Sequence, residues 1–222
     1  MIAVDVNPAS LTLRLGNYNI RRMAPEDLPA VTSLDQQVFK EPWPESAYVQ
    51  ELYYNLHAHY FVLEFNPYSA AITRRRRKSR SARTICGFVG VRVERGRGHI
   101  STLAVHPEWR GQGWGEILLI VALEQAVLLK VGSVNLEVRV SNEAARRLYA
   151  KYGFTLCRRL QRYYRDGEDA FLLELKSLDA DYQRVLSENF RRLRAQVTHP
   201  HGITELAISR QPLAITFRPN HK

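Results

Sequence analysis

The sequence has few cysteines and no long apolar segment. Cys86 and Cys157 are the only cysteines among 222 residues, too few for a disulfide framework or a cysteine-rich metal site. The longest apolar run, residues 117–123, is bounded by glutamates and is far shorter than the roughly 20 residues that span a bilayer. The first ten residues lack the basic start and apolar run of a signal peptide. We therefore expect a cytoplasmic protein with no membrane partner.

Acidic residues are also scarce, with 22 Asp and Glu against 32 Lys and Arg and a net charge of +10. This excess favours an anionic partner, such as a nucleic acid or a nucleotide cofactor, but it is also compatible with a protein that is merely basic. Five consecutive basic residues run from Arg74 to Lys78 inside a polar insert at residues 66–83. We interpret the insert as a solvated loop, and contact with rRNA or the ribosome is the alternative.

Apolar periodicity divides the rest of the chain into strands and helices. Alternating residues predict strands at residues 18–23, 60–65, 85–93, 99–105 and 133–140, and a strand-like piece at 213–217. Helical spacing predicts helices at residues 25–38 and 45–56, after Gly115, from Ser141 or Asn142 to Gly153, and at residues 182–197. A tight turn at residues 95–98 predicts a hairpin. We expect one domain over residues 1–176 and a C-terminal extension over residues 177–222. The helix of the extension should pack against the domain through an apolar stripe formed by Tyr182, Val185, Leu186, Phe190, Leu193 and Val197.

Three glycines, Gly111, Gly113 and Gly115, join the strand at residues 99–105 to a long apolar helix. Glycine lets the backbone approach a ligand and adopt positive φ, and a helix start offers unpaired N–H groups to an anion. The turn therefore predicts a pyrophosphate cradle, with simple helix capping as the alternative. It is neither a Rossmann fingerprint, which needs glycine where Glu116 stands, nor a P-loop, which ends in Gly-Lys-Ser/Thr.

A carboxylate and a tyrosine follow in the next two elements. Glu137 lies on the polar side of the strand at residues 133–140, as a general base or as an ion-pair partner of Arg139 or another base. Asn142 and Tyr149 are seven positions apart and so share one face of the following helix. Spacing alone leaves Tyr149 as a core residue with a solvated hydroxyl.

Two motifs resemble the GNAT acetyltransferase superfamily. Arg110-x-x-Gly113-x-Gly115, preceded by Leu-Ala-Val-His-Pro, resembles its motif A. Residues 136–154 resemble motif B of the RimI-type ribosomal-protein alanine N-acetyltransferases, and the resemblance covers roughly residues 18–65 and 84–175. It implies an α/β GNAT fold, in which helices flank a central twisted mixed sheet.

The resemblance also implies a co-substrate, acetyl-CoA, and roles for individual residues, with no metal. Glu137 would accept a proton from the substrate amine, and Tyr149 would donate one to the leaving thiolate. A backbone N–H of the strand that pairs with the pantetheine arm would stabilise the oxyanion. The implied CoA contacts are Leu103, Ala104, Val105, Arg110, Gly111, Gln112, Gly113, Trp114, Gly115, Glu116 and Asn142.

The implied acceptor is the N-terminal α-amine of an alanine-starting small-subunit ribosomal protein. Its reference pKa near 8 demands only a modest base, whereas a lysine ε-amine, near 10.4, demands more. A lysine or a small-molecule amine is the second reading. A non-catalytic RNA-binding module is the third, and the presence of Glu137, Asn142 and Tyr149 argues against it.

Overall fold

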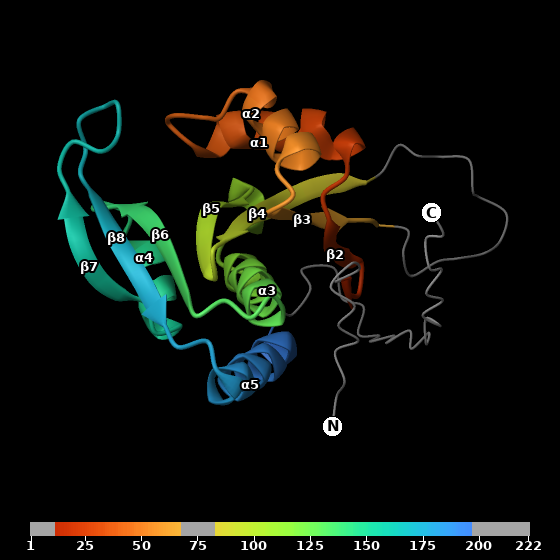
Figure 1. Cartoon of the computed structure of the whole chain (residues 1–222). Coiled ribbons are helices and arrows are strands. Elements are labelled where there is room, and N and C mark those ends of the chain that lie inside the picture. The colour runs from red at the N-terminus through yellow and green to blue at the C-terminus, as the bar shows by residue number, and fades with distance from the viewer. Residues whose placement is uncertain (1–11, 68–82, 197–222) are drawn as a thin grey trace, which may run out of the picture.

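Residues 12–67 and 83–196 are described by a computed structural model of the chain (Figure 1). The basic run from Arg74 to Lys78 and the strand-like piece at residues 213–217 lie outside these ranges, so both interpretations stay predictions.

In the described part of the chain, eight strands form one sheet in the order β1-β2-β3-β4-β5-β6-β8-β7. Only β5 and β6 pair in parallel, and every other neighbouring pair is antiparallel. The strands are β1 (Leu13–Leu15), β2 (Tyr18–Arg22), β3 (Ala58–Phe65), β4 (Thr84–Glu94), β5 (Arg97–Val105), β6 (Ser133–Arg139), β7 (Thr155–Leu160) and β8 (Ala170–Lys176). The predicted mixed sheet is confirmed.

Helices cover both faces of the sheet, with α1 and α2 on one face and α3 on the other (Figure 1). Short 3-10 turns at Pro25–Asp27 and Pro107–Trp109 precede α1 and α3. The α-helices are α1 (Leu28–Val38), α2 (Glu45–Val49), α3 (Trp114–Leu128), α4 (Glu143–Lys151) and α5 (Ala180–Gln196). The predicted helix at residues 45–56 is shorter than expected, because α2 passes into one π-helical turn, Gln50–Tyr54, and ends there. None of the described helices combines the length and apolar character needed to cross a bilayer.

Helix α3 has no polar face, and it is enclosed between the sheet on one side and α5 on the other. Ten of its fifteen residues are buried, and α5 packs beneath it on the side away from the sheet (Figure 1). Leu186 and Leu193 of α5 belong to the same buried cluster as α3. A helix without a polar face has to be enclosed in this way. The C-terminal helix therefore completes the environment of the helix that follows the glycine turn.

Two details of the sequence interpretation change. Val185 was assigned to the apolar stripe of the C-terminal helix, but its side chain is 48% exposed, because the buried face runs through Leu186 instead. The hairpin turn is confirmed and narrows to two residues, Arg95 and Gly96, both with positive φ. That geometry matches the right-handed twist of the paired strands.

Candidate active site

The parallel strands β5 and β6 separate soon after they begin. They pair only over Arg97–His99 and Ser133–Asn135, although β5 runs on to Val105 and β6 to Arg139. Ser101 lacks a partner in the β4 register, since Gly90 pairs with Thr102 and Val91 with Ile100. An extra residue of this kind bends a strand, and this bulge lies where the two strands part.

The separation leaves a free backbone edge on the second half of β5. Leu103, Ala104 and Val105 pair with β4 on one side, and β6 does not pair with them on the other. An unpaired strand edge can accept hydrogen bonds from an extended ligand. These are the three residues predicted to contact the pantetheine arm.

The glycine turn lies at the end of this strand. Gly111 and Gly113 have φ of 74° and 87°, a region in which a side chain adds roughly 1–2 kcal/mol of strain. Gly113 is the N-cap of α3, and its position provides no side-chain hydrogen bond to the helix start. The first-turn amides of α3 are therefore left for another acceptor. Gly115 differs, because a Cβ there would make only an ordinary contact, 3.7 Å from Val105.

Side chains of the turn hold its shape. The Nε–H of Arg110 donates to the carbonyl of Val105 at 3.0 Å, which ties the turn to the strand. Gln112 donates to the carbonyl of Glu108 at 3.0 Å and faces the indole N–H of Trp114 at 3.4 Å. Trp114 is only 1% exposed. Its indole belongs to the core, so a ligand at this position meets its backbone.

Glu116, in the first turn of α3, connects the glycine turn to the C-terminal helix. Its carboxylate accepts hydrogen bonds from the Tyr152 hydroxyl at 2.6 Å and from Lys151 Nζ at 2.5 Å. The hydroxyl of Tyr182 in α5 in turn donates to the backbone carbonyl of Tyr152 at 2.8 Å. The Glu116 carboxylate is thus occupied by protein donors, and its amide is the group that remains for a phosphate.

Glu137 lies on β6 beside the separation. Its Oε2 is 3.5 Å from Nε2 of His99, the last β5 residue to pair with β6. The His99 Nδ1 is 2.7 Å from the amide oxygen of Asn135. In the tautomer with its proton on Nδ1, His99 donates to Asn135 and keeps Nε2 toward Glu137. Arg139, the partner considered for Glu137 from the sequence, instead pairs with Glu41, Asp166 and Glu168.

Tyr149 lies on α4, whose start is capped by Asn142. The Asn142 side chain accepts a hydrogen bond from the Ala145 amide at 3.1 Å, so Asn142 and not Ser141 is the cap. Tyr149 is 8% exposed, and burial, with a smaller contribution from the charge of Tyr164, raises its pKa well above 10. The phenol is therefore protonated at neutral pH. Among the described residues its hydroxyl has no hydrogen-bond partner.

Tyr164 lies within electrostatic reach of both predicted catalytic residues. Burial raises its pKa to about 12, Arg139 opposes that rise, and the charge of Glu137 adds to it. The charge of Tyr164 acts in turn on Tyr149. Glu137 and Tyr149 are therefore each coupled to Tyr164 through charge.

Comparison with known proteins agrees with this geometry. The Acetyltransferase (GNAT) family profile matches residues 28–154. The chain belongs to the GNAT family. Enzymes of this family transfer acetyl groups from acetyl-CoA, so this GNAT protein is an N-acetyltransferase. An open strand edge that leads to uncapped helix amides suits an extended pantetheine arm followed by a diphosphate.

Individual relatives give the same result. N-alpha-acetyltransferase RimI of Mycobacterium tuberculosis is 32% identical over 160 residues, covering 69% of this chain and 89% of the relative. A Bacillus subtilis protein, named as a candidate ribosomal protein bS18-alanine N-acetyltransferase, is 32% identical over 155 residues, covering 69% of this chain and 92% of its own. The crystal structure of the Escherichia coli ribosomal-protein-S18-alanine N-acetyltransferase is 26% identical with a TM-score of 0.60, covering 73% of this GNAT chain and 96% of the other.

Sequence reasoning missed three residues around Glu137. In the sequence, His99 is recognised only as the start of a predicted strand, Arg139 only as a possible partner of Glu137, and Tyr164 only as one of residues 84–175, which resemble the family. Strand pairing could have indicated His99, because it is polar and precedes the glycine turn on the strand next to β6. The partners of Arg139 and Tyr164 depend on loops that the local pattern does not place.

Proposed function

We propose that this protein transfers the acetyl group of acetyl-CoA to the N-terminal α-amine of a protein, by direct attack of the amine on the thioester. The observation that carries the proposal is the open edge of β5, which runs from the separation of β5 and β6 to the uncapped amides at the start of α3, with Glu137 on β6 beside it. Glu137 on β6 is the proton acceptor that we propose for the amine, and Tyr149 on α4 is the proton donor that we propose for the leaving thiolate.

The backbone supports the acetyl-CoA site that we propose. The amides of residues 111–116 would hold the diphosphate, with Arg110 beside them, and Leu103, Ala104 and Val105 would pair with the pantetheine arm. A backbone N–H of the same strand would stabilise the oxyanion. The Asn142 oxygen is used for capping, so its NH₂ group is the part available to CoA.

Glu137 would take the proton from the substrate ammonium group. His99 Nε2 lies 3.5 Å from the Glu137 carboxylate, beyond the roughly 2.6–3.2 Å over which a proton passes directly, so the two groups would have to approach each other to share that proton. Tyr149 would protonate the leaving thiolate, and its raised pKa keeps the proton on the phenol until a thiolate forms beside it.

The preferred acceptor is an alanine-starting N-terminus of a small-subunit ribosomal protein. The names of the Bacillus subtilis and Escherichia coli proteins support this substrate. Local charge agrees, because three carboxylates, Glu41, Asp166 and Glu168, surround the single guanidinium of Arg139, two positions after Glu137, in a chain whose net charge is +10. Acidic surroundings attract the ammonium form of an incoming N-terminus.

Mass spectrometry of peptides incubated with acetyl-CoA tests the proposal. Peptides carrying the alanine-starting N-terminus of a small-subunit ribosomal protein should gain one acetyl group at the α-amine, and the Glu137→Gln enzyme should be about 10²- to 10⁴-fold slower. The control peptide has a blocked N-terminus and an internal lysine. Acetylation at internal lysines alone would reject the N-terminal acceptor in favour of an ε-amine.

A further inference from the structure

The guanidinium group of Arg139, two positions after Glu137 on β6, forms ion pairs with three carboxylates. Arg139 Nη1 is 2.9 Å from each carboxylate oxygen of Asp166 and 2.9 Å from Glu168 Oε2. Its Nη2 is 3.2 Å from Glu41 Oε1. The Arg139 side chain is 16% exposed, so solvent screens these ion pairs less than ordinary surface pairs.

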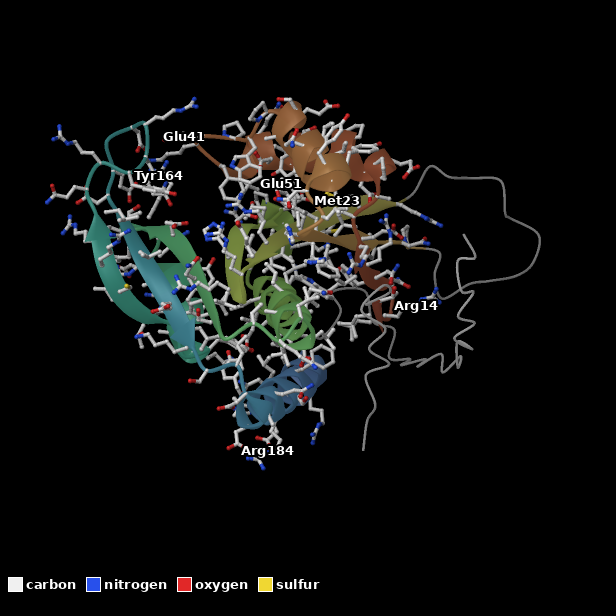
Figure 2. All side chains as sticks on the ribbon, viewed as in Figure 1. Arg14, Met23, Glu41, Glu51, Tyr164 and Arg184 are labelled. Carbon is white, nitrogen blue, oxygen red and sulfur yellow. The ribbon has the colours of Figure 1, made fainter. Side chains whose placement is uncertain are left out.

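The carboxylates come from two loops far apart in the sequence. Glu41 lies in the loop between α1 and α2 (residues 39–44), whereas Asp166 and Glu168 lie in the loop between β7 and β8 (residues 161–169). The Asp166 amide also donates to Glu41 at 3.3 Å, and Lys40 Nζ is 3.4 Å from Asp166. Figure 2 shows Glu41 and Tyr164, one from each loop, close together. The two loops therefore meet at the end of β6, through Arg139.

The same guanidinium contacts the ring of Tyr164, on which the charge of Glu137 acts. Arg139 Cζ lies 3.8 Å from the centre of the Tyr164 ring, a close cation–π contact. Arg139 follows Glu137 by two positions on β6, so both side chains project from the same side of the strand. The contact thus orients Tyr164 beside Glu137.

Arginine is the side chain that can make all of these contacts together. Its planar group provides donors in several directions and a flat face for an aromatic ring, and lysine provides neither arrangement. Without the guanidinium, Glu41, Asp166 and Glu168 would repel each other, and within residues 12–67 and 83–196 Lys40 is the only other cation that forms an ion pair with any of them. The α1–α2 and β7–β8 loops would then move apart.

We propose that Arg139 is a positioning residue, which joins the α1–α2 and β7–β8 loops into one wall of the acceptor site and holds Tyr164 beside Glu137. This inference rests on the proposed function, because it assigns the wall to the acceptor peptide. Arg139 does not touch the separation of β5 and β6 near Leu103–Val105, so acetyl-CoA binding should not depend on it.

The test compares Arg139→Met with a matched control, Arg159→Met. Arg159 makes one ion pair, 2.6 Å to Asp169, in the same hairpin, is 59% exposed, and does not reach the α1–α2 loop. Loss of charged hydrogen bonds predicts an increase of about 10- to 100-fold in the peptide KM of Arg139→Met. The KM for acetyl-CoA should stay within about twofold. Arg139→Lys should recover part of the loss, and Arg159→Met should behave as wild type.

A second variant covers the case in which Arg139→Met folds poorly. Glu41→Gln removes only the link to the α1–α2 loop, and it should raise the peptide KM in the same direction by less. In the double variant the two effects should not add, because both remove one shared interaction. Hydrogen exchange at residues 39–44 should speed up in Arg139→Met and Glu41→Gln but not in Arg159→Met.

The outcomes separate this inference from the proposed function. If wild-type enzyme leaves the alanine peptides unmodified, the acceptor assignment fails, and hydrogen exchange still reports whether Arg139 joins the loops. If wild-type enzyme is active while Arg139→Met and Glu41→Gln keep the wild-type peptide KM, the positioning role is overturned. Equal changes in both KM values and in kcat would also overturn it, since they would indicate general damage.

Discussion

Glu124, in the middle of α3, should make the stability of this protein depend on pH. Burial raises the pKa of its carboxyl group to about 6, from an ordinary value of 4.5. Glu124 has no ion-pair partner among the described side chains, and its charge adds to the rise in the pKa of Tyr182 in α5, where burial is the larger cause. The α3–α5 contact therefore encloses the Glu124 carboxyl group in surroundings that favour its neutral form.

The sign and size of the effect follow from proton linkage. The folded protein binds this proton more tightly than the unfolded chain, so unfolding free energy falls as the pH rises from about 4.5 to about 6. The difference of about 1.5 in pKa corresponds to about 2 kcal/mol of lost unfolding free energy. This loss is absent below that pH window and complete above it.

Glu124→Gln removes this charge and should stabilise the protein by about 2 kcal/mol at pH 7.5, with no comparable gain at pH 4. For a chain of this size the gain corresponds to a Tm increase of about 4–8 °C. Denaturant unfolding at both pH values measures it. Glu188→Gln, an exposed change on α5, should stay within about 0.5 kcal/mol. Equal stability of Glu124→Gln and wild type at both pH values would refute the buried charge.

Three further changes probe the rest of the structure. Gly113→Ala places a side chain at φ 87°, and about 1–2 kcal/mol of strain should appear as a higher KM for acetyl-CoA in steady-state kinetics; an unchanged KM would argue against the cradle. Tyr149→Phe should lower kcat by about 10²- to 10⁴-fold with little change in peptide KM, and wild-type turnover would exclude a general acid here. Leu186→Ala, at a fully buried site in α5, should cost about 2–5 kcal/mol in thermal or denaturant unfolding. Val185→Ala, at a 48% exposed site one residue away, should cost under about 0.5 kcal/mol, and similar losses in both would contradict the docking of α5.

Local chemistry determined the parts of the site that lie within one stretch of chain. Gly111 and Gly113 could be recognised because the backbone there requires positive φ. Glu137 could be recognised because strict alternation puts it on the polar side of a buried strand. The C-terminal helix was visible from its apolar spacing, although one residue of its stripe, Val185, proved to face solvent.

The order of the strands in the sheet could not be predicted from local sequence patterns. β8 lies between β6 and β7 in the sheet, and neither β7 nor β8 was assigned from periodicity, although both lie in a segment that resembles the family. All side chains of β7 before its last residue are exposed at the sheet edge, so no buried face imposes a regular apolar pattern. The pairing of β8 with β6 is a contact between segments more than thirty residues apart.

Only the tertiary structure decided which charges and rings surround Glu137. Arg139 meets Glu168 from 29 positions away and Glu41 from 98 positions away. The α1–α2 and β7–β8 loops are both polar, and the sequence predicts only ordinary surface turns there. Ion pairs across such distances depend on where the folded strands and helices bring the loops, and residue type alone carries no record of that position. The amino-acid sequence thus determined the glycine turn and the face of β6 that carries Glu137, and the packing of the two loops decided which charged groups surround Arg139.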